Sequence, residues 1–275
     1  MKILVVGDCH GEKPEIPDED FDYIIATGDV CGDSDEVREN MFRSIDEDEE
    51  WYDMMGREAA KKAVESSLRE GREVLEHLSS KGVPVYLVPG NWDWTGEIYE
   101  DWNYLKKDRY RSIVKDFDNV HDVNFSSRTI DGHTLIGYGP CSGPEIPQYE
   151  DDKPEDEEEL EGLKEEYREN KEELEKLFQS DEPIIFLSHN VPNNTSLDRI
   201  DNEDSPAHGR HYGSIIVREL VDEYQPVVSI AGHMHEGYGS ERLGETLCIN
   251  AGLNATVMLE IEDGEVKSAE FRPEP

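Results

Sequence analysis

Five short apolar stretches of the sequence each end in side chains that can bind a metal ion. In an extended chain, residues i and i+2 point to the same side. Two donors at this spacing, such as Asp8 and His10, therefore converge on one point. His233 and His235 repeat this arrangement after Gly232, with Met234 between them turned to the opposite side as a packing residue. Together the five endings supply seven donors, which are Asp8, His10, Asp29, Asn91, His189, His233 and His235.

The number and type of these donors predict two divalent ions. Seven oxygen and imidazole donors exceed what one ion with about four to six ligands needs. A shared carboxylate lets two ions lie about 3.5–4 Å apart, the spacing used in two-metal phosphoester hydrolysis. Carboxylate and imidazole ligands without a thiolate favour manganese, with iron or zinc as alternatives, over calcium.

The elements that must position these donors are predicted to alternate between strands and helices, which indicates an α/β fold. Apolar runs indicate strands, and apolar residues at steps of three or four indicate helices. Asp131-Gly132 indicates a hairpin. A strand, helix, strand order predicts parallel pairing, and open α/β sheets bind ligands at the carboxyl ends of their strands. Strands are expected at 2–7, 23–27, 83–88, 183–188, 227–231, 246–250, 255–261 and 266–271, and helices within 35–80, from the acidic stretch 150–159 to about 178, and over 214–224.

Chain length and composition favour one domain with a strongly acidic surface. The 275 residues fit a single large α/β domain, residues 1–275, with an acidic helical insertion at about 140–182. Asp and Glu number 66 against 27 Lys and Arg, a net charge of −39 that makes a nucleic-acid partner a poor expectation. No nearby lysines offset the carboxylates, so the chain resembles proteins of salt-accumulating halophiles. We expect it to work in a high-salt cytoplasm, and the alternative is an ordinary acidic protein of a mesophile.

The sequence contains no membrane-spanning segment and no signal peptide, so we expect a soluble, cytoplasmic protein. Its four cysteines, which include Cys9 and Cys31, have no CxxC spacing and are expected to be reduced. Alternation along the strands turns Cys9 and Cys31 away from the donors, and both are interpreted as small buried residues. The oligomeric state is left open.

The order of the motifs resembles the calcineurin-like metallophosphoesterase superfamily. These motifs are Asp8-x-His10, Gly28-Asp29, Gly90-Asn91-x-Asp93, Ser188-His189 and Gly232-His233-x-His235. The stretch from Gly209 to Gly237 is most similar to prokaryotic phosphoesterases described as Icc-related.

This resemblance implies a four-layer α/β/β/α sandwich with two mixed sheets and the metals at the strand ends. By the family pattern, Asp29 bridges two ions. Asp8, His10 and His235 complete one site, and Asn91, His189 and His233 complete the other. The implied reaction is hydrolysis of a small phosphomonoester or phosphodiester by a hydroxide held between the metals.

The sequence departs from the family pattern at Trp92, where many members carry a histidine that contacts the phosphate and can protonate the leaving group. Trp92 has one N–H donor and no titratable proton. A substitute histidine, a substrate with a good leaving group, or lost catalysis would each be consistent with this change. His211 is the first candidate substitute and His208 the second, with Arg210 as a phosphate-binding residue. The alternative is a surface loop without a catalytic role.

Two further alternatives remain open. Trp92 and Trp94 could form an aromatic wall for a nucleobase or could be ordinary packing residues. The whole chain could also be a non-catalytic, metal-bound scaffold. The acidic helix and Trp92 favour this second function, and the complete set of donors argues against it.

Overall fold

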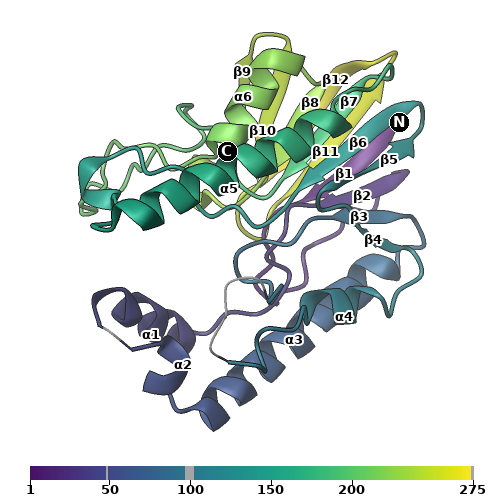
Figure 1. The fold of residues 1–275 in the computed structure, drawn as a ribbon. Helices are drawn as coiled ribbons and strands as arrows, with labels where there is room; N and C mark the ends of the chain where they lie inside the picture. The colour runs from purple at the N-terminus through teal and green to yellow at the C-terminus, as the bar shows by residue number, and fades with distance from the viewer. Residues whose placement is uncertain (48, 97–101, 274–275) are drawn as a thin grey trace.

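The computed structural model describes residues 1–47, 49–96 and 102–273 and contains two stacked six-stranded sheets with helices outside them (Figure 1). The first sheet has the order β12-β11-β1-β2-β3-β4 and the second the order β5-β6-β7-β8-β10-β9. The strands are β1 (Lys2–Val6), β2 (Tyr23–Ala26), β3 (Val85–Leu87), β4 (Val120–Asp122), β5 (Ser126–Ile130), β6 (His133–Tyr138), β7 (Ile184–Ser188), β8 (Val228–Ala231), β9 (Gly239–Leu243), β10 (Thr246–Asn250), β11 (Thr256–Glu262) and β12 (Glu265–Arg272).

Helices cover the outer face of each sheet, which gives the expected α/β/β/α arrangement (Figure 1). The second sheet is covered by α5 and α6, and the first sheet by the helices on the opposite side of the molecule. The helices are α1 (Asp35–Asp46), α2 (Trp51–Met54), α3 (Arg57–Ser79), α4 (Tyr110–Val114), α5 (Glu157–Leu177) and α6 (Ile215–Tyr224), with short 3₁₀ turns at Glu150–Asp152 and His235–Gly237.

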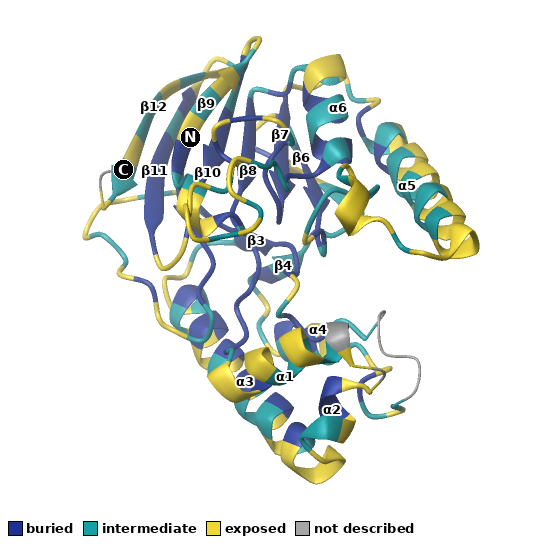
Figure 2. Cartoon of the chain, turned by 90° about the vertical axis from the view of Figure 1, so that its left-hand side faces the viewer, coloured by how far each residue is buried: buried dark blue, intermediate teal, exposed yellow. Residues whose placement is uncertain are grey.

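Alternation along the strands builds three apolar cores between these four layers. In β1, Ile3 and Val5 face the core between the sheets, whereas Leu4 and Val6 face α3. The third core lies between the second sheet and α5 and α6, where Leu174 packs. Figure 2 shows buried strands in the middle and exposed outer helix faces. The fully apolar strand runs of the sequence are therefore strands buried on both faces.

The pairing expected from the sequence is confirmed. β1, β2 and β3 pair in parallel, and β5 and β6 form an antiparallel hairpin across Asp131 and Gly132. Both turn residues have positive φ, 45° and 74°, which explains the use of Asp-Gly there. Strand β9 was not expected from its sequence, which is Gly-Ser-Glu-Arg-Leu.

One predicted boundary was wrong, because the acidic stretch from residue 150 does not open the long helix. It forms a 3₁₀ turn, and α5 begins only at Glu157, where the Asp156 side chain accepts a hydrogen bond from Glu158 N at 2.8 Å. An aspartate is a strong N-cap, and Pro154 lies just before it in the sequence. The division into one domain with an insertion at 140–182 stays a prediction.

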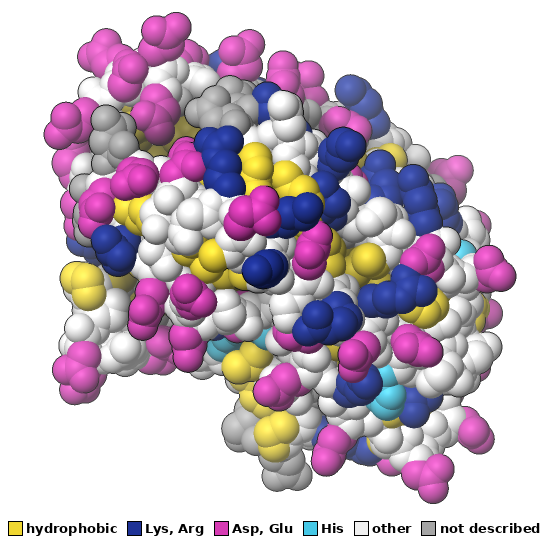
Figure 3. All heavy atoms as spheres, turned by 90° about the horizontal axis from the view of Figure 1, so that it is seen from below, with side chains coloured by type: hydrophobic (Ala, Val, Ile, Leu, Met, Phe, Trp, Pro, Cys, Tyr) yellow, Lys and Arg dark blue, Asp and Glu magenta, His cyan; other side chains and the backbone are white. Residues whose placement is uncertain are grey.

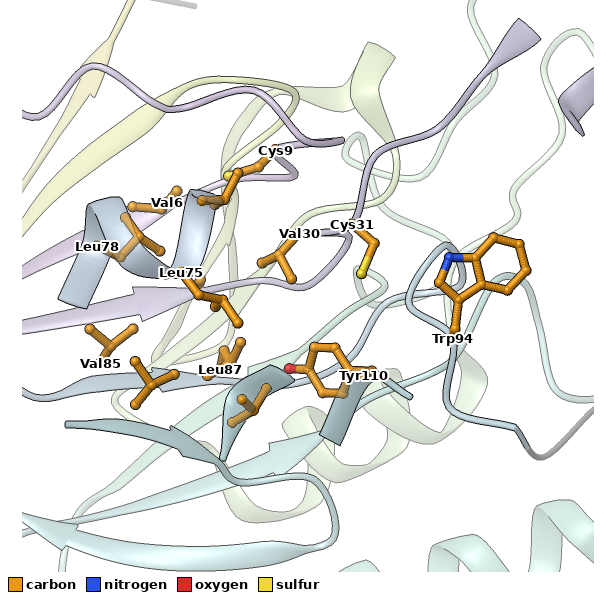
Figure 4. Close-up of a cluster of buried hydrophobic side chains, with 14 of the residues drawn as sticks. Val6, Cys9, Val30, Cys31, Leu75, Leu78, Val85, Leu87, Trp94 and Tyr110 are labelled. Carbon is orange, nitrogen blue, oxygen red and sulfur yellow. The ribbon is translucent and has the colours of Figure 1, made fainter. Parts of the chain in front are cut away.

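The cysteines behave as small apolar residues. All four are buried and unpaired by disulfides, and Cys9 and Cys31 lie in the core between the first sheet and α3 (Figure 4). Burial raises the pKa of both thiols above the ordinary value, helped by the nearby carboxylates of Asp29 and Asp93. Trp94 is buried in the same core and is therefore an ordinary packing residue. Its ring is not exposed to form a wall for a nucleobase.

The sequence analysis expected no lysines near the carboxylates, and the structure differs from this on one face. Figure 3 shows Lys and Arg side chains gathered among carboxylates on the face seen from below. Ion pairs such as Arg72–Asp116 and Lys61–Glu65 show that basic residues do offset carboxylates on and beside α3. In the described ranges, no helix has the length and apolar character needed to cross a bilayer.

Candidate metal centre

The predicted ligands converge because the carboxyl ends of strands from both sheets meet at one place. β1, β2 and β3 of the first sheet, and β7 and β8 of the second, each run into a loop that carries a predicted ligand. Backbone hydrogen bonds tie these loops together, from His10 N to Asp29 O at 2.8 Å and from Gly232 N to His189 O at 2.9 Å. Residues far apart in the sequence are thereby held side by side.

Six of the seven predicted ligands form two groups of donors. One group contains Asp8, His10 and His235, and the other contains Asp29, His189 and His233. Within each group the three ligand atoms lie within 4.8 Å of one another. The seventh, Asn91, has its side-chain Oδ1 atom 2.9 Å from His189 Nε2 and therefore lies beside the second group.

Asp29 belongs to the second group and also faces the first. Its Oδ2 atom is 3.7 Å from His10 Nε2 in one group and 3.5 Å from His189 Nε2 in the other. Its Oδ1 atom accepts a hydrogen bond from Trp92 N at 2.7 Å, which fixes the carboxylate plane. One oxygen is therefore directed at both groups, as a bridging ligand requires.

Thr27 is not one of the predicted ligands, but it contacts one ligand in each group and orients both. Its hydroxyl donates to Asp8 Oδ1 at 2.8 Å, and its carbonyl oxygen lies 2.9 Å from His189 Nδ1. Because a carbonyl only accepts, this contact places the hydrogen of a neutral His189 on Nδ1 and leaves a lone pair on Nε2. That lone pair faces Asp29 and Asn91. Such outer contacts typically orient metal-binding histidines, and Thr27 was missed although it directly precedes the Gly28-Asp29 motif.

The chemistry of the donor set fits divalent metal ions. Asp8 and Asp29 are buried, and burial together with the nearby Asp8 and Asp93 raises the pKa of Asp29 well above its usual value. Burial opposes ionisation of Asp8, but hydrogen bonds from His235 and Thr27 lower its pKa to about 2. Buried carboxylates this close need cations to balance them.

Two histidines of the site, His10 and His233, are suited to act as neutral ligands. Burial lowers the pKa of His10, and burial together with the nearby His189 lowers the pKa of His233 to about 3. Both ring nitrogens of His10 are buried without a hydrogen-bond partner among the described residues. A metal ion binds neutral imidazole, so an orphaned ring facing carboxylates fits a ligand better than a structural histidine.

The close approach of the loops requires unusual backbone conformations at the ligands. His10, Asp29 and His233 all have positive φ, at 44°, 47° and 63°. A side chain on Gly90 would place its Cβ 2.2 Å from Asp29 Oδ1, and one on Gly232 would lie 2.2 Å from Asp8 Oδ1. Non-glycine residues in this region cost about 1–3 kcal/mol each and cluster at functional sites.

Trp92, which stands where many relatives have a histidine, packs beside His10 with ring centroids 6.4 Å apart. The Arg38 guanidinium lies 5.7 Å from the Trp92 ring centroid and forms an ion pair with Asp33. Asp33 Oδ2 is in turn 3.4 Å from His10 Nδ1, the ring nitrogen on the opposite side from Asp29. Sequence analysis missed Asp33 and Arg38, although Asp33 lies only four residues after Asp29.

His211 has a strong carboxylate partner, but the described contacts do not join it to the two donor groups. Its Nδ1 atom is 2.7 Å from Asp198 Oδ1, and buried Asp198 also accepts from the backbone N–H groups of Thr195 and Gly213. The loop lies next to the site, because Asn190 Nδ2, one residue after His189, donates to Tyr212 O at 3.0 Å. The role of His211 as a substitute acid stays a prediction.

The other two loop candidates are placed less favourably. Arg210 pairs with Asp151 at 2.7 Å and lies 4.7 Å from the Tyr149 ring centroid, so its guanidinium is already engaged. His208 is exposed on the loop. The phosphate-binding role of Arg210 and the substitute role of His208 also stay predictions.

Comparison with known proteins identifies the class of this fold and site. The family model described as calcineurin-like phosphoesterase matches residues 1–237, and the chain belongs to this family. It is therefore a member of a family of metal-dependent phosphoester hydrolases, and its structure contains two candidate metal sites.

One of the similar solved structures supports the fold. One crystal structure is 16% identical, covers 98% of both chains and superimposes with a TM-score of 0.63. The crystal structure of TT1561 of Thermus thermophilus is also 16% identical over 98% of this chain and 97% of that chain, with a TM-score of 0.48. A search of curated proteins found no significant match.

Proposed function

We propose that the chain is a dinuclear metal-dependent phosphoesterase that hydrolyses a small phosphomonoester or phosphodiester. The observation that carries this proposal is the position of Asp29 Oδ2, within 3.7 Å of a ring nitrogen from each of the two donor groups. Family membership supports it independently. When bound, two divalent ions activate water and neutralise phosphate oxygens.

The roles of the chain's own residues follow from their contacts. Asp29 lies between the sites, and the carbonyl oxygen of Thr27 orients His189. Exposed Asn91 presents its side-chain amide beside the second group, where it can also bond a substrate oxygen. His211, held by Asp198, is the proposed proton donor to the leaving group. Arg210 and Trp92 are the proposed contacts to the substrate.

Several finer points belong to the same proposal. Manganese is the favoured metal, with iron or zinc as alternatives, because the donors are carboxylates and imidazoles. The similarity of residues 209–237 supports an Icc-related subgroup, and the charge of −39 supports a high-salt cytoplasm. The proposed partner is a small phosphoester, with neither nucleic acid nor membrane involved.

Nitrophenyl esters test the reaction directly. Purified protein in molar KCl should release nitrophenol from mono-nitrophenyl or bis-nitrophenyl phosphate when Mn²⁺ is added, and chelation should stop the release. Asp29→Ala should remove the activity. The two esters distinguish a monoesterase from a diesterase.

The second candidate is a non-catalytic, metal-bound scaffold. Trp92 favours it, because this side chain supplies no proton at the place where many relatives carry a histidine. The α5 helix also favours it, since its outer face is exposed and acidic. Metal-loaded protein that turns over neither ester would support the scaffold and contradict the hydrolase.

A further inference from the structure

A cavity of about 490 Å³ opens beside the candidate metal centre. Gly90 and Asn91 form its end nearest the donor groups, and Ser142 lies in its wall. The Ser142 carbonyl oxygen is 3.0 Å from His233 Nε2, so the cavity and the second donor group share a boundary. A phosphate held at the metal centre would direct its esterified alcohol into this space, which has the volume of an ordinary small-molecule site.

Three aromatic residues, Phe125, Tyr138 and Tyr167, are among those that line the cavity. Phe125 and Tyr138 meet edge to face with ring centroids 5.5 Å apart, and Tyr167 comes from α5. The hydroxyls of both tyrosines already have partners: Tyr138 donates at 3.2 Å to Glu145, which also lines the cavity, and Tyr167 donates at 2.6 Å to Glu219. A ligand therefore meets their rings rather than their hydroxyls.

The charged residues that line the cavity are all acidic. Asp93, Glu145 and Glu166 line it, and the described lining contains no lysine or arginine. Asp93 is engaged by the backbone N–H groups of Gly90 and Cys31, and Glu145 accepts from Ile215 N at the start of α6. Glu166 is exposed and makes no hydrogen bond or ion pair with the described residues, so it is the carboxylate available to a ligand.

Aromatic faces beside a free carboxylate recognise an organic ammonium, because cations bind the faces of aromatic rings and pair with carboxylates. A second phosphate or a carboxylate in the same place would be repelled by Glu166 and would find no cation in the described lining. We propose that the cavity binds an ammonium group on the alcohol part of the substrate, which makes the substrate a phosphoester of an amino alcohol. This inference rests on the proposed hydrolase and names its substrate class.

A matched pair of esters tests the inference. Phosphocholine and 3,3-dimethylbutyl phosphate have the same shape, but only the first carries a cation. We expect kcat/KM for phosphate release to be at least about tenfold higher for phosphocholine at one fixed KCl concentration. Binding of choline and of 3,3-dimethylbutanol to the protein, measured by calorimetry, gives a readout that needs no turnover and should show the same preference.

Glu166→Gln should reduce this preference, and Glu166→Lys should abolish or reverse it. The matched control is Glu165→Lys, which makes the same charge change at the exposed neighbouring residue outside the cavity lining and should leave the preference within about twofold. Equal kcat/KM for the two esters, equal binding of the two alcohols, or equal effects of the two lysine variants would each overturn the inference. The hydrolase fails separately, if neither nitrophenyl ester is turned over, and choline binding still tests the cavity in that case.

Discussion

Replacing Asp29 with asparagine should impair metal binding while leaving the fold intact. The side chain is buried, and its Oδ2 atom faces both donor groups. An amide keeps an acceptor for Trp92 N but removes the negative charge between the groups. We therefore expect the variant to fold and to lose most of its response to metal.

The size of the effect follows from the chain length and from ligand linkage. A ligand at one hundred times its Kd stabilises a protein by about 2.7 kcal/mol per site. Unfolding entropy of about 2.1 cal/mol/K per residue gives about 0.6 kcal/mol/K for 275 residues. Two sites should then raise Tm by about 9 °C in the wild type.

If Asp29→Asn weakens each site about 100-fold, the same metal concentration contributes only about 0.4 kcal/mol per site, and the shift falls to about 1–2 °C. Without metal, the variant should melt above the wild type, because burial and the nearby Asp8 and Asp93 carboxylates raise the pKa of Asp29, so a neutral amide costs less there than a carboxylate.

Differential scanning calorimetry in molar KCl, with chelator or with Mn²⁺, measures both shifts. Asp116→Asn is the control, since it removes the same charge from the half-exposed pair with Arg72, and it should keep the full metal response. An Asp29→Asn variant that keeps a metal shift near that of the wild type would refute the bridging position.

Three further outcomes are expected. Asp33→Asn should weaken metal affinity about 10–100-fold in calorimetric titration, with unchanged circular dichroism, because the Asp33 carboxylate lies 3.4 Å from His10 Nδ1 and adds negative charge beside this ligand; unchanged affinity would contradict this. His211→Ala should slow turnover of alkyl phosphates far more than that of nitrophenyl phosphates, and equal losses would argue against its role as proton donor. The denaturation midpoint should rise between low salt and molar KCl, since salt screens charges over about 3 Å at 1 M, and a flat response would reject adaptation to high salt.

The convergence of the ligands could be predicted from the sequence because it depends on local rules. Each donor directly follows an apolar run, and parallel strands bring their carboxyl ends to the same edge. Asp8 and His233 are 225 residues apart, yet His233 N donates to Asp8 Oδ2 at 2.7 Å. Family resemblance supplied the division into two sites.

The surroundings of the site could not be predicted in the same way, because they depend on tertiary packing between distant segments. Glu145 caps α6, whose first residue, Ile215, is 70 positions later, and Glu166 reaches the cavity only because Leu174 and Phe178 fix α5 on the second sheet. No local pattern in the acidic helix distinguishes Glu166 from its neighbour Glu165.

The geometry of the donors implies that binding and stability oppose each other at this site. His10, Asp29 and His233 are held at positive φ, and Asp8 and Asp29 are buried close together, so the metal-free site contains both backbone strain and charge repulsion. Contacts elsewhere in the fold must outweigh these costs, and the loops are held by bonds such as His10 N to Asp29 O. Metal ions would relieve the repulsion without changing the strained backbone. Neutralising Asp29 should therefore stabilise the metal-free protein and destabilise the metal-bound one, whereas substitutions at Gly90 or Gly232 should destabilise both.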